Sequence, residues 1–230
     1  MKRQKSYFEV YAHEYDILTN AKDRKPYHYK EISTLVEKFK PKLVLDAGCA
    51  TGISGFMLAQ HNIKTIGIDR SKQMIQQATK NYGHLEPLLT FRYGNFEKLP
   101  KTMYNKFDMI VCLANSLSGV GSTKNLITSL YNFNKVLVPG GTLVIQLLNY
   151  ISIKDGKFLP IRVTRKDNII YQRFSERQGK RLYIYVNRLD ISEDPPKYEM
   201  FRHEFENFNP KEIIEALKKT KFRSMKKYDN

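Results

Sequence analysis

Four short, nearly continuous apolar runs separated by helix-like segments limit the fold of this chain more than any other feature of its sequence. A strand that is buried on both faces has this pattern, and such strands occur in parallel sheets flanked by helices. A fifth run of strand length is more polar. The five runs cover residues 43–46, 65–69, 89–93, 107–113 and 142–147. Because helical segments at 53–60, 73–82 and 125–136 alternate with them, we predict an α/β fold with a doubly wound, mostly parallel sheet.

The pattern changes after residue 150. Three strand-like runs between 160 and 191 predict an antiparallel β-meander inserted after the fifth strand. A further strand is expected at 198–208, a helix at 211–220 and a short strand at 222–228. We therefore divide the chain into an N-terminal helical leader or cap (1–42), a parallel core (43–150), an antiparallel insert that forms a lid or substrate wall (151–197) and a segment that completes the core (198–230).

The composition is typical of a globular protein, with 41% hydrophobic and 12% aromatic residues in 230. No apolar run reaches the roughly 18–20 residues of a membrane span, and no signal-peptide pattern follows the N-terminus, so we expect a cytoplasmic protein. Cys49 and Cys112 are too few for a disulfide framework or a cysteine-based zinc site. The histidines lack metal-ligand spacing, so no metal is expected, and His203 is expected at the surface.

The formal net charge of +16 admits two interpretations. A clustered excess would indicate a nucleic-acid partner, whereas a dispersed excess indicates a solvated, lysine-rich surface. The basic residues are spread over the whole chain, which favours the second interpretation. The insert nevertheless keeps an RNA hypothesis open, because it places seven basic residues among tyrosines: Arg162, Arg165, Lys166, Arg173, Arg177, Lys180 and Arg181.

The strongest local motif is the segment 43–52, LVLDAGCATG. A buried strand enters a tight turn of small residues, and the helix that follows has free backbone N–H groups at its start. Asp69 ends the next strand, where an acidic side chain suits the ribose hydroxyls of a nucleoside. From Gly48 the pattern is G-x-A-x-G, which is neither the dinucleotide fingerprint nor a P-loop, so NAD and ATP are disfavoured.

These motifs together resemble those of the class I S-adenosylmethionine-dependent methyltransferases, which have a Rossmann-like fold. Segment 44–52 is similar to their first motif, 66–69 to the second, 107–113 to the fourth strand and 138–143 to the turn before the fifth. Segments 94–96, 112–116 and 148–150 narrow the resemblance to the glycine N-methyltransferase-like branch of small-molecule N-methyltransferases. The resemblance implies S-adenosyl-L-methionine as cofactor and in-line transfer of a methyl group to a small-molecule acceptor, with an amine favoured.

The resemblance also implies which residues hold the cofactor. Asp69 would bind the ribose hydroxyls, while Asn95 and Phe96 would hold the adenine. Lys25, or its neighbour Arg24, would neutralise the methionine carboxylate. The whole implied set is Tyr15, Lys25, Asp46, Gly48, Ala50, Gly52, Asp69, Arg70, Met74, Asn95, Phe96 and Leu113.

Acceptor residues are expected at the carboxyl ends of the fourth and fifth strands, where open α/β sheets bind ligands. The backbone of Leu113 would face the methionine amino group, and Asn115 and Tyr150 would act on the acceptor by orienting it. A sulfonium is a good leaving group, so the reaction needs alignment and exclusion of water rather than covalent catalysis. An amine acceptor must lose its proton before it attacks.

The chain departs from the family pattern at three places. Ala50 replaces a usual glycine of the first motif, which would lower the affinity for the cofactor. Leu148 replaces the arginine that glycine methyltransferases place on the substrate carboxylate, so glycine itself is disfavoured as the acceptor. The seventh strand of the family is expected to be missing, which would leave a sheet edge that a partner subunit or the leader must cover.

Two other functions remain open from the sequence. One is an RNA-directed methyltransferase that uses the basic insert, and the other is a non-catalytic cofactor-binding protein that acts in interactions or regulation. The hypothesis of a small-molecule enzyme takes a small acceptor as its partner, with no membrane, and includes a homo-oligomer as one way to cover the sheet edge.

Overall fold

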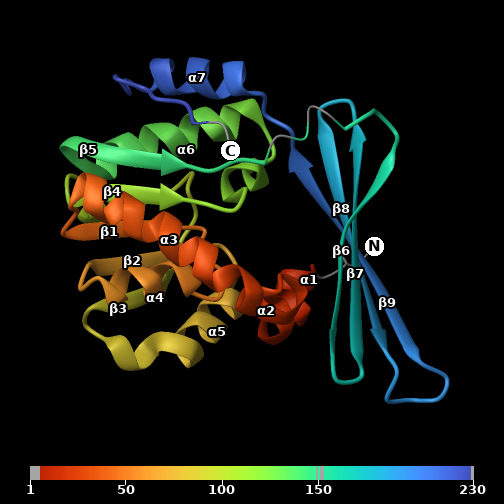
Figure 1. Cartoon of the computed structure of the whole chain (residues 1–230). Coiled ribbons are helices and arrows are strands. Elements are labelled where there is room, and N and C mark those ends of the chain that lie inside the picture. Colours follow the sequence, from red (N-terminus) through yellow and green to blue (C-terminus); the bar gives the residue numbers. More distant parts are fainter. Residues whose placement is uncertain (1–5, 149, 151–152, 229–230) are drawn as a thin grey trace.

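The fold consists of two separate sheets with a helical leader between them (Figure 1). A computed structural model describes residues 6–148, 150 and 153–228. The larger sheet is parallel throughout, which confirms the predicted Rossmann-like architecture. In spatial order its strands are β3 (Leu89–Tyr93), β2 (Lys64–Asp69), β1 (Leu43–Ala47), β4 (Phe107–Cys112) and β5 (Leu137–Ile145).

Helices cover both faces of the parallel sheet, as the continuous apolar strands require. On one face, Ile32 of α3 (Ala21–Phe39) and Met57 of α4 (Ile53–Gln60) pack with Val44 of β1. On the other face, Phe133 of α6 (Thr123–Val136) and Ile213 of α7 (Pro210–Lys219) belong to the same apolar cluster as the neighbouring strand residues. A further helix, α5 (Lys72–Tyr82), packs against β2 and β3.

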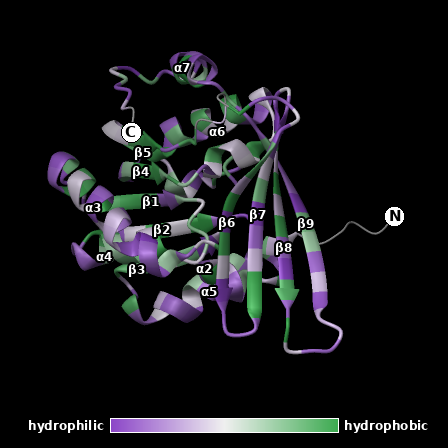
Figure 2. Ribbon diagram, turned by 45° about the vertical axis from the view of Figure 1, so that its right-hand side comes forward, coloured by the Kyte–Doolittle hydropathy of each residue, from purple (hydrophilic) through white to green (hydrophobic). Residues whose placement is uncertain are grey.

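The smaller sheet is an antiparallel meander of four strands, which we call the lid sheet. Its strands are β6 (Phe158–Lys166), β7 (Ile169–Gln178), β8 (Arg181–Asp190) and β9 (Lys197–Glu206). Hydrophilic and hydrophobic residues alternate along these strands (Figure 2). Alternation of this kind gives one covered face and one face toward solvent.

The expectation that residues 198–230 complete the parallel sheet is wrong in two respects. The strand expected at 198–208 is β9, and it pairs with β8 of the lid sheet along its whole length. Its buried residues alternate, as in Phe201 and His203, so β9 suits a sheet with one covered face. Residues 222–228 form no strand, and their apolar side chains do not alternate regularly, since Phe222, Met225 and Tyr228 are three residues apart.

The outer edge of β5 has no strand paired with it among the described residues. The leader contacts a face of the parallel sheet and the lid sheet, so it does not cover this edge as one of the two expectations held. Cover by a partner subunit stays a prediction.

The leader joins the two sheets through an aromatic cluster. Its first helices are α1 (Tyr7–Val10) and α2 (Tyr15–Leu18), and the cluster links them to β7, β8 and β9. The ring of Tyr7 lies edge-on to Tyr171 of β7, with centroids 5.8 Å apart, and to Phe201 of β9, at 5.7 Å. Such aromatic contacts add to the free energy gained from burying the rings. The leader is therefore part of the core and not a loose extension.

A buried ion pair lies beside this cluster. The guanidinium of Arg188 on β8 donates from Nε to Glu14 Oε2 at 2.9 Å and from Nη2 to Glu14 Oε1 at 3.0 Å. Tyr171 also donates a hydrogen bond to the Glu14 carboxylate. The Arg188 side chain is 7% exposed and lies 4.5 Å from the Tyr11 ring. Leader and lid sheet are thus joined by a bidentate, charge-assisted contact.

One carboxyl group is buried within the parallel sheet without full compensation. Asp46 on β1 is 2% exposed, and its Oδ2 atom has no hydrogen-bond partner in the described chain. Burial raises the pKa of Asp46 to about 7, and the nearby charge of Asp69 adds to this effect. Asp46 therefore stays protonated in the folded protein at pH values where it ionises in the unfolded chain.

Replacing Arg188 tests the connection between leader and lid. We expect Arg188→Ala to lower the free energy of unfolding by about 3 kcal/mol, because it leaves the Glu14 carboxylate buried without a cation. Urea unfolding followed by circular dichroism measures the change. Arg165→Ala is the matched control, since Arg165 is exposed and bonds only to the Asp167 carbonyl within its own turn. Equal, small effects of the two variants would contradict the role of the pair.

The pKa of Asp46 predicts a pH dependence of stability. Between the ordinary pKa of 3.8 and about 7, the unfolded chain releases a proton that the folded protein keeps. Stability is therefore lost as the pH rises through this window and levels off above it. From pH 5 to pH 8 we expect the wild type to lose about 3 kcal/mol relative to Asp46→Asn, measured by urea unfolding. Parallel pH profiles of the two proteins would contradict this.

Candidate functional site

The candidate site lies where β1, β2 and β4 end at the same edge of the parallel sheet. The loop at 48–52 follows β1 and is held to β2, because the backbone N–H groups of Gly48 and Cys49 donate to the Ile68 carbonyl at 2.9 and 3.0 Å. Asp69 then accepts from the Ala50 N–H at 3.0 Å and from the Ser71 N–H at 2.8 Å. The carboxylate predicted to bind a ligand therefore also shapes the loop.

Two glycines of the loop are required by close approach as well as by backbone conformation. Gly48 has φ +83°, and a Cβ there would lie 2.5 Å from Ser116 Oγ and 3.4 Å from the Phe96 ring. Gly52 has φ +90°, and its Cβ would meet the Phe91 ring at 2.6 Å. Ala50 also lies in the left-handed region, at φ +47°, which strains a residue with a side chain. The glycine usual at position 50 would relieve that strain.

Two carboxyl groups, those of Asp69 and Asp46, lie at the floor of the site. Asp69 is half-buried, and desolvation raises its pKa despite the hydrogen bonds that its carboxylate accepts. The unpartnered Oδ2 of Asp46 lies under the same loop. Each group favours a cation or a hydrogen-bond donor as its neighbour, since either would offset the cost of burying a carboxyl group.

The other predicted cofactor residues are distributed around this floor. Tyr15 is half-buried at the start of α2, and Met74 is buried in α5. Asn95 is exposed, with its side-chain oxygen accepting from the Glu97 N–H at 3.2 Å. The Phe96 ring packs against Phe133, at a centroid distance of 5.3 Å, and so lies between the core and Gly48.

Arg70 and Lys25, the two basic residues of the predicted cofactor set, differ in their contacts. Arg70 reaches across the site and donates from Nη1 to the Gly119 carbonyl at 2.8 Å, which ties the end of β2 to the segment after β4. Lys25 is exposed. Its neighbour Arg24 is close enough to Tyr15 and to Arg173 of β7 to perturb both pKa values. Of the two alternatives for the methionine carboxylate, Arg24 is thus the one whose charge acts on Tyr15 and Arg173.

The ends of β4 and β5 are joined by the Asn115 side chain. Asn115 is 9% exposed, and its Oδ1 accepts from the Ser118 hydroxyl at 3.0 Å and from the Leu148 N–H at 3.3 Å. Leu113 is also buried, and its carbonyl accepts from the Ser116 hydroxyl at 2.8 Å. Within the described part of the chain the amide nitrogen of Asn115 makes no hydrogen bond, so it could contact an acceptor molecule.

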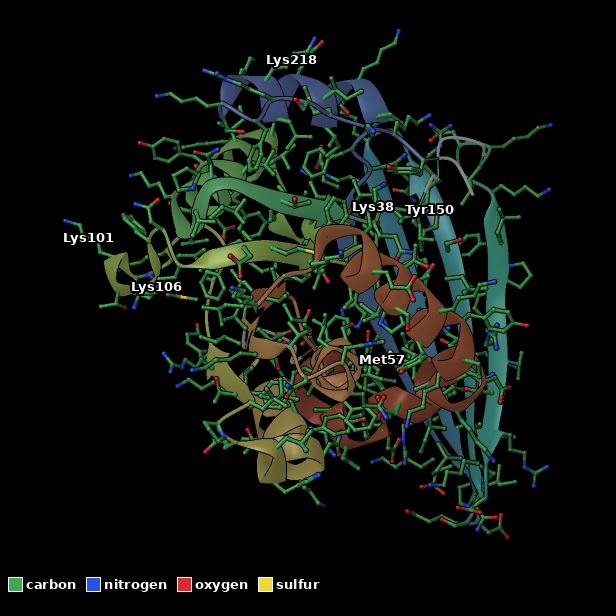
Figure 3. All side chains as sticks on the ribbon, turned by 60° about the vertical axis from the view of Figure 1, so that its left-hand side comes forward. Lys38, Met57, Lys101, Lys106, Tyr150 and Lys218 are labelled. Atoms are coloured by element: carbon green, nitrogen blue, oxygen red, sulfur yellow. The ribbon has the colours of Figure 1, made fainter. Side chains whose placement is uncertain are left out.

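Tyr150 lies on the connection between the two sheets (Figure 3). It is half-buried, and desolvation raises the pKa of its hydroxyl, while the positive charge of Arg173 opposes the shift. Arg173 of the lid sheet therefore lies near Tyr150.

Some contacts of the site carry no recognisable sequence signal. Asp16 of α2 accepts a hydrogen bond from the Thr51 hydroxyl at 2.6 Å, which ties the leader to the cofactor loop. Arg173 stands out in the sequence only as one basic residue among seven. The alternation along β7 is the signal that could have found it, because Arg173 lies two residues after Tyr171 and therefore on the same face.

The expectation that His203 lies at the surface is wrong. Its side chain is buried against the Phe8 ring, with centroids 4.5 Å apart, and its Nε2 has no hydrogen-bond partner in the described chain. Burial lowers the pKa of His203 to about 4, and the charge of Arg70 contributes. The cause is the alternation along β9, which turns His203 toward the leader together with Phe201.

The described residues contain neither a metal-binding cluster nor a membrane-spanning helix. No group of three or more histidine, cysteine, aspartate or glutamate side chains there is arranged to hold a metal ion. No described helix is long and apolar enough to cross a membrane.

Comparison with known proteins identifies methyltransferases among the relatives. The family model described as "Methyltransferase domain" matches residues 38–220. The glycine/sarcosine N-methyltransferase of Aphanothece halophytica is 25% identical over 155 residues, which are 67% of this chain and 58% of that protein. The glycine/sarcosine/dimethylglycine N-methyltransferase of Actinopolyspora halophila is 28% identical over 160 residues, which are 64% and 28% of the two chains. The chain thus spans little more than half of the first relative.

Solved structures share the fold at low sequence identity. An S-adenosylmethionine-dependent methyltransferase from Clostridium acetobutylicum matches with a TM-score of 0.74 at 18% identity, over 91% of this chain and 85% of that one. DesVI from Streptomyces venezuelae matches with a TM-score of 0.74 at 21% identity, over 96% and 92%. The sheet order, the loop after β1, the family match over residues 38–220 and these relatives agree: the chain belongs to the methyltransferase-domain family, among the class I S-adenosylmethionine-dependent methyltransferases.

Proposed function

We propose that the protein transfers a methyl group from S-adenosyl-L-methionine to the amino group of a small molecule. The observation that carries the proposal is the pair of acidic groups around the glycine loop, Asp69 beside it and the unpartnered Asp46 beneath it. The relatives named as glycine and sarcosine N-methyltransferases support an amine as the acceptor. A solved relative described as an amino pentose methyltransferase with bound cofactor has the same fold at a TM-score of 0.69 and 19% identity.

The residues present fit this cofactor. Asp69 offers acceptor atoms for ribose hydroxyls, since one oxygen accepts from the Ala50 N–H of the loop, the other accepts from the Ser71 N–H after β2, and a carboxylate has about four acceptor sites. The cofactor carries a sulfonium and an ammonium group, which the Asp69 carboxylate favours, and the unpartnered Oδ2 of the buried Asp46 carboxyl adds a polar atom that could accept a hydrogen bond. Arg24 suits the methionine carboxylate, and Phe96 offers an apolar ring beside Gly48 for the adenine.

The reaction requires the protein mainly to position the amine and the methyl group. S-adenosyl-L-methionine supplies an activated methyl group that a neutral amine attacks in line with the breaking bond to sulfur. We assign the orienting role to the free amide nitrogen of Asn115 and the hydroxyl of Tyr150, which lie at the ends of β4 and β5. The lid sheet and the leader would exclude water from the reaction. The amine proton leaves to solvent before attack.

The alternative of an RNA substrate gains no support from the lid sheet. Lys180 pairs with Glu212 at 2.7 Å, and Arg181 pairs with Glu204 and Glu206 at 3.0 and 2.9 Å. Two of the tyrosines that would stack on bases are engaged: Tyr171 is fully buried, and Tyr185 donates to Glu176. Stacking and phosphate contacts need free rings and free cations on one face.

Cofactor binding tests the proposal directly. We expect isothermal titration with S-adenosyl-L-methionine to show one site, and Asp69→Asn to weaken it at least about tenfold, because a charged acceptor for the ribose is lost. Asp167→Asn is the matched control, since Asp167 lies in an exposed turn at φ +52°, which asparagine tolerates. Formation of S-adenosylhomocysteine with O-phosphoethanolamine, β-alanine and glucosamine then tests the transfer. A folded protein that releases no heat with the cofactor would refute the proposal.

A further inference from the structure

The inner face of the lid sheet, which faces the leader and the parallel sheet, presents two arginines side by side. Arg162 of β6 and Arg173 of β7 are directly opposite each other in the antiparallel register. Opposed residues of such a pair share a face, with roughly 5 Å between their Cβ atoms. Tyr171, two residues before Arg173, is fully buried against the leader, so this face is the inner one. Arg173 is half-buried and Arg162 exposed, which places the pair at the rim of the covered region.

Neither arginine has an acidic partner. Among the described residues the side chains of Arg162 and Arg173 make no ion pair, and Arg173 Nε is buried without a hydrogen-bond acceptor. Burial lowers the pKa of Arg173, and the positive charges of Arg24 and Arg162 lower it further. Arg188 on the neighbouring strand is different, because Glu14 binds it in a bidentate manner. A half-buried guanidinium without a partner is costly, and an anion would remove that cost.

The unpaired arginines lie next to the candidate site rather than elsewhere on the lid. Tyr15 and Tyr150 are both close enough to Arg173 for their charges to affect its pKa. Helix α2, which begins at Tyr15, packs beside β6. The arginines therefore face the leader side of the site and the segment that follows β5.

The number of charges exceeds what the cofactor can neutralise. Arg24, Arg162 and Arg173 place three cations in this region, and the cofactor of the proposed function brings one carboxylate, which suits Arg24. Leu148 is 55% exposed and apolar, so the anchor that the glycine methyltransferases use at that position is absent. Two cations remain for a second anion.

We propose that Arg173 and Arg162 form a subsite for an anionic group of the methyl acceptor, so that the acceptor is an amine carrying a carboxylate or a phosphate. The assignment rests on the proposed function and deepens it. The anion is held by the lid sheet and not by the end of β5. The paired guanidinium groups suit planar, bidentate recognition of either oxyanion.

Isothermal titration of the full chain loaded with S-adenosylhomocysteine tests the subsite. Two matched probe pairs differ only in the charge of the tail: β-alanine against β-alaninamide, and O-phosphoethanolamine against ethanolamine. We expect the anionic member of at least one pair to bind about tenfold or more tightly than its neutral partner. The pair that shows the preference tells a carboxylate subsite from a phosphate subsite.

Arg173→Gln should abolish that preference while leaving the affinity for S-adenosylhomocysteine within about twofold. Arg165→Gln is the control, because it removes the same charge from an exposed position near the end of β6 in the same sheet. The assignment is overturned if neither anionic probe is preferred, if Arg173→Gln keeps the preference, or if Arg173→Gln weakens S-adenosylhomocysteine tenfold, since Arg173 would then serve the cofactor. Failure of the unmodified protein to bind S-adenosylhomocysteine would instead overturn the proposed function.

Discussion

The bidentate pair between Glu14 and Arg188 is the directional contact that fixes the lid sheet against the leader. The parallel sheet and the lid sheet have no strand in common, so their relative position is set by packing through the leader and by the contact of β9 with the segment Ser116–Val120 after β4. The leader fills the space between the sheets with tyrosine and phenylalanine rings, and apolar packing of this kind is strong but weakly directional. The ion pair supplies direction, because its two hydrogen bonds fix one register of the leader against β8.

The site that results has charges of opposite sign on its two sides. The Asp69 carboxylate, with the buried Asp46 carboxyl nearby, lies on the side of the parallel sheet, and Arg162 and Arg173 lie on the side of the lid sheet. Tyr15 and Tyr150 stand between these groups, with hydroxyls whose pKa is raised by burial. A cofactor with cationic groups and an acceptor with an anionic group would each meet charges of the opposite sign.

The parallel sheet could be predicted from the sequence because its strands are buried on both faces and therefore read as continuous apolar runs. The cofactor loop could be predicted because Gly48 and Gly52 have conformations that other residues avoid. The partner of β9 could not, because alternation identifies a strand with one covered face but does not say which sheet it joins. The same limit explains His203: its neighbours on the strand indicate a period of two, and only the position of the leader shows which face is covered.

Arg173 illustrates a second limit. Seven basic residues in one insert look alike in the sequence, yet the structure separates them into those with acidic partners, such as Lys180 and Arg181, and those without. Charge patterning counts residues, whereas the cost of a charge depends on its partners and its exposure. Pairing across the sheet is what singles out Arg162 and Arg173 from the rest.

The spacing of two acidic residues in the leader has a consequence for how the binding of one ligand affects the affinity for another. Glu14 holds the lid sheet through Arg188, and Asp16, two residues later, holds the cofactor loop through Thr51. One short segment of the leader thus contacts both the lid sheet and the cofactor loop. If a ligand that stabilises the loop also stabilises the leader conformation that positions the lid, the two binding equilibria are thermodynamically linked, and each ligand then raises the affinity for the other by the same factor.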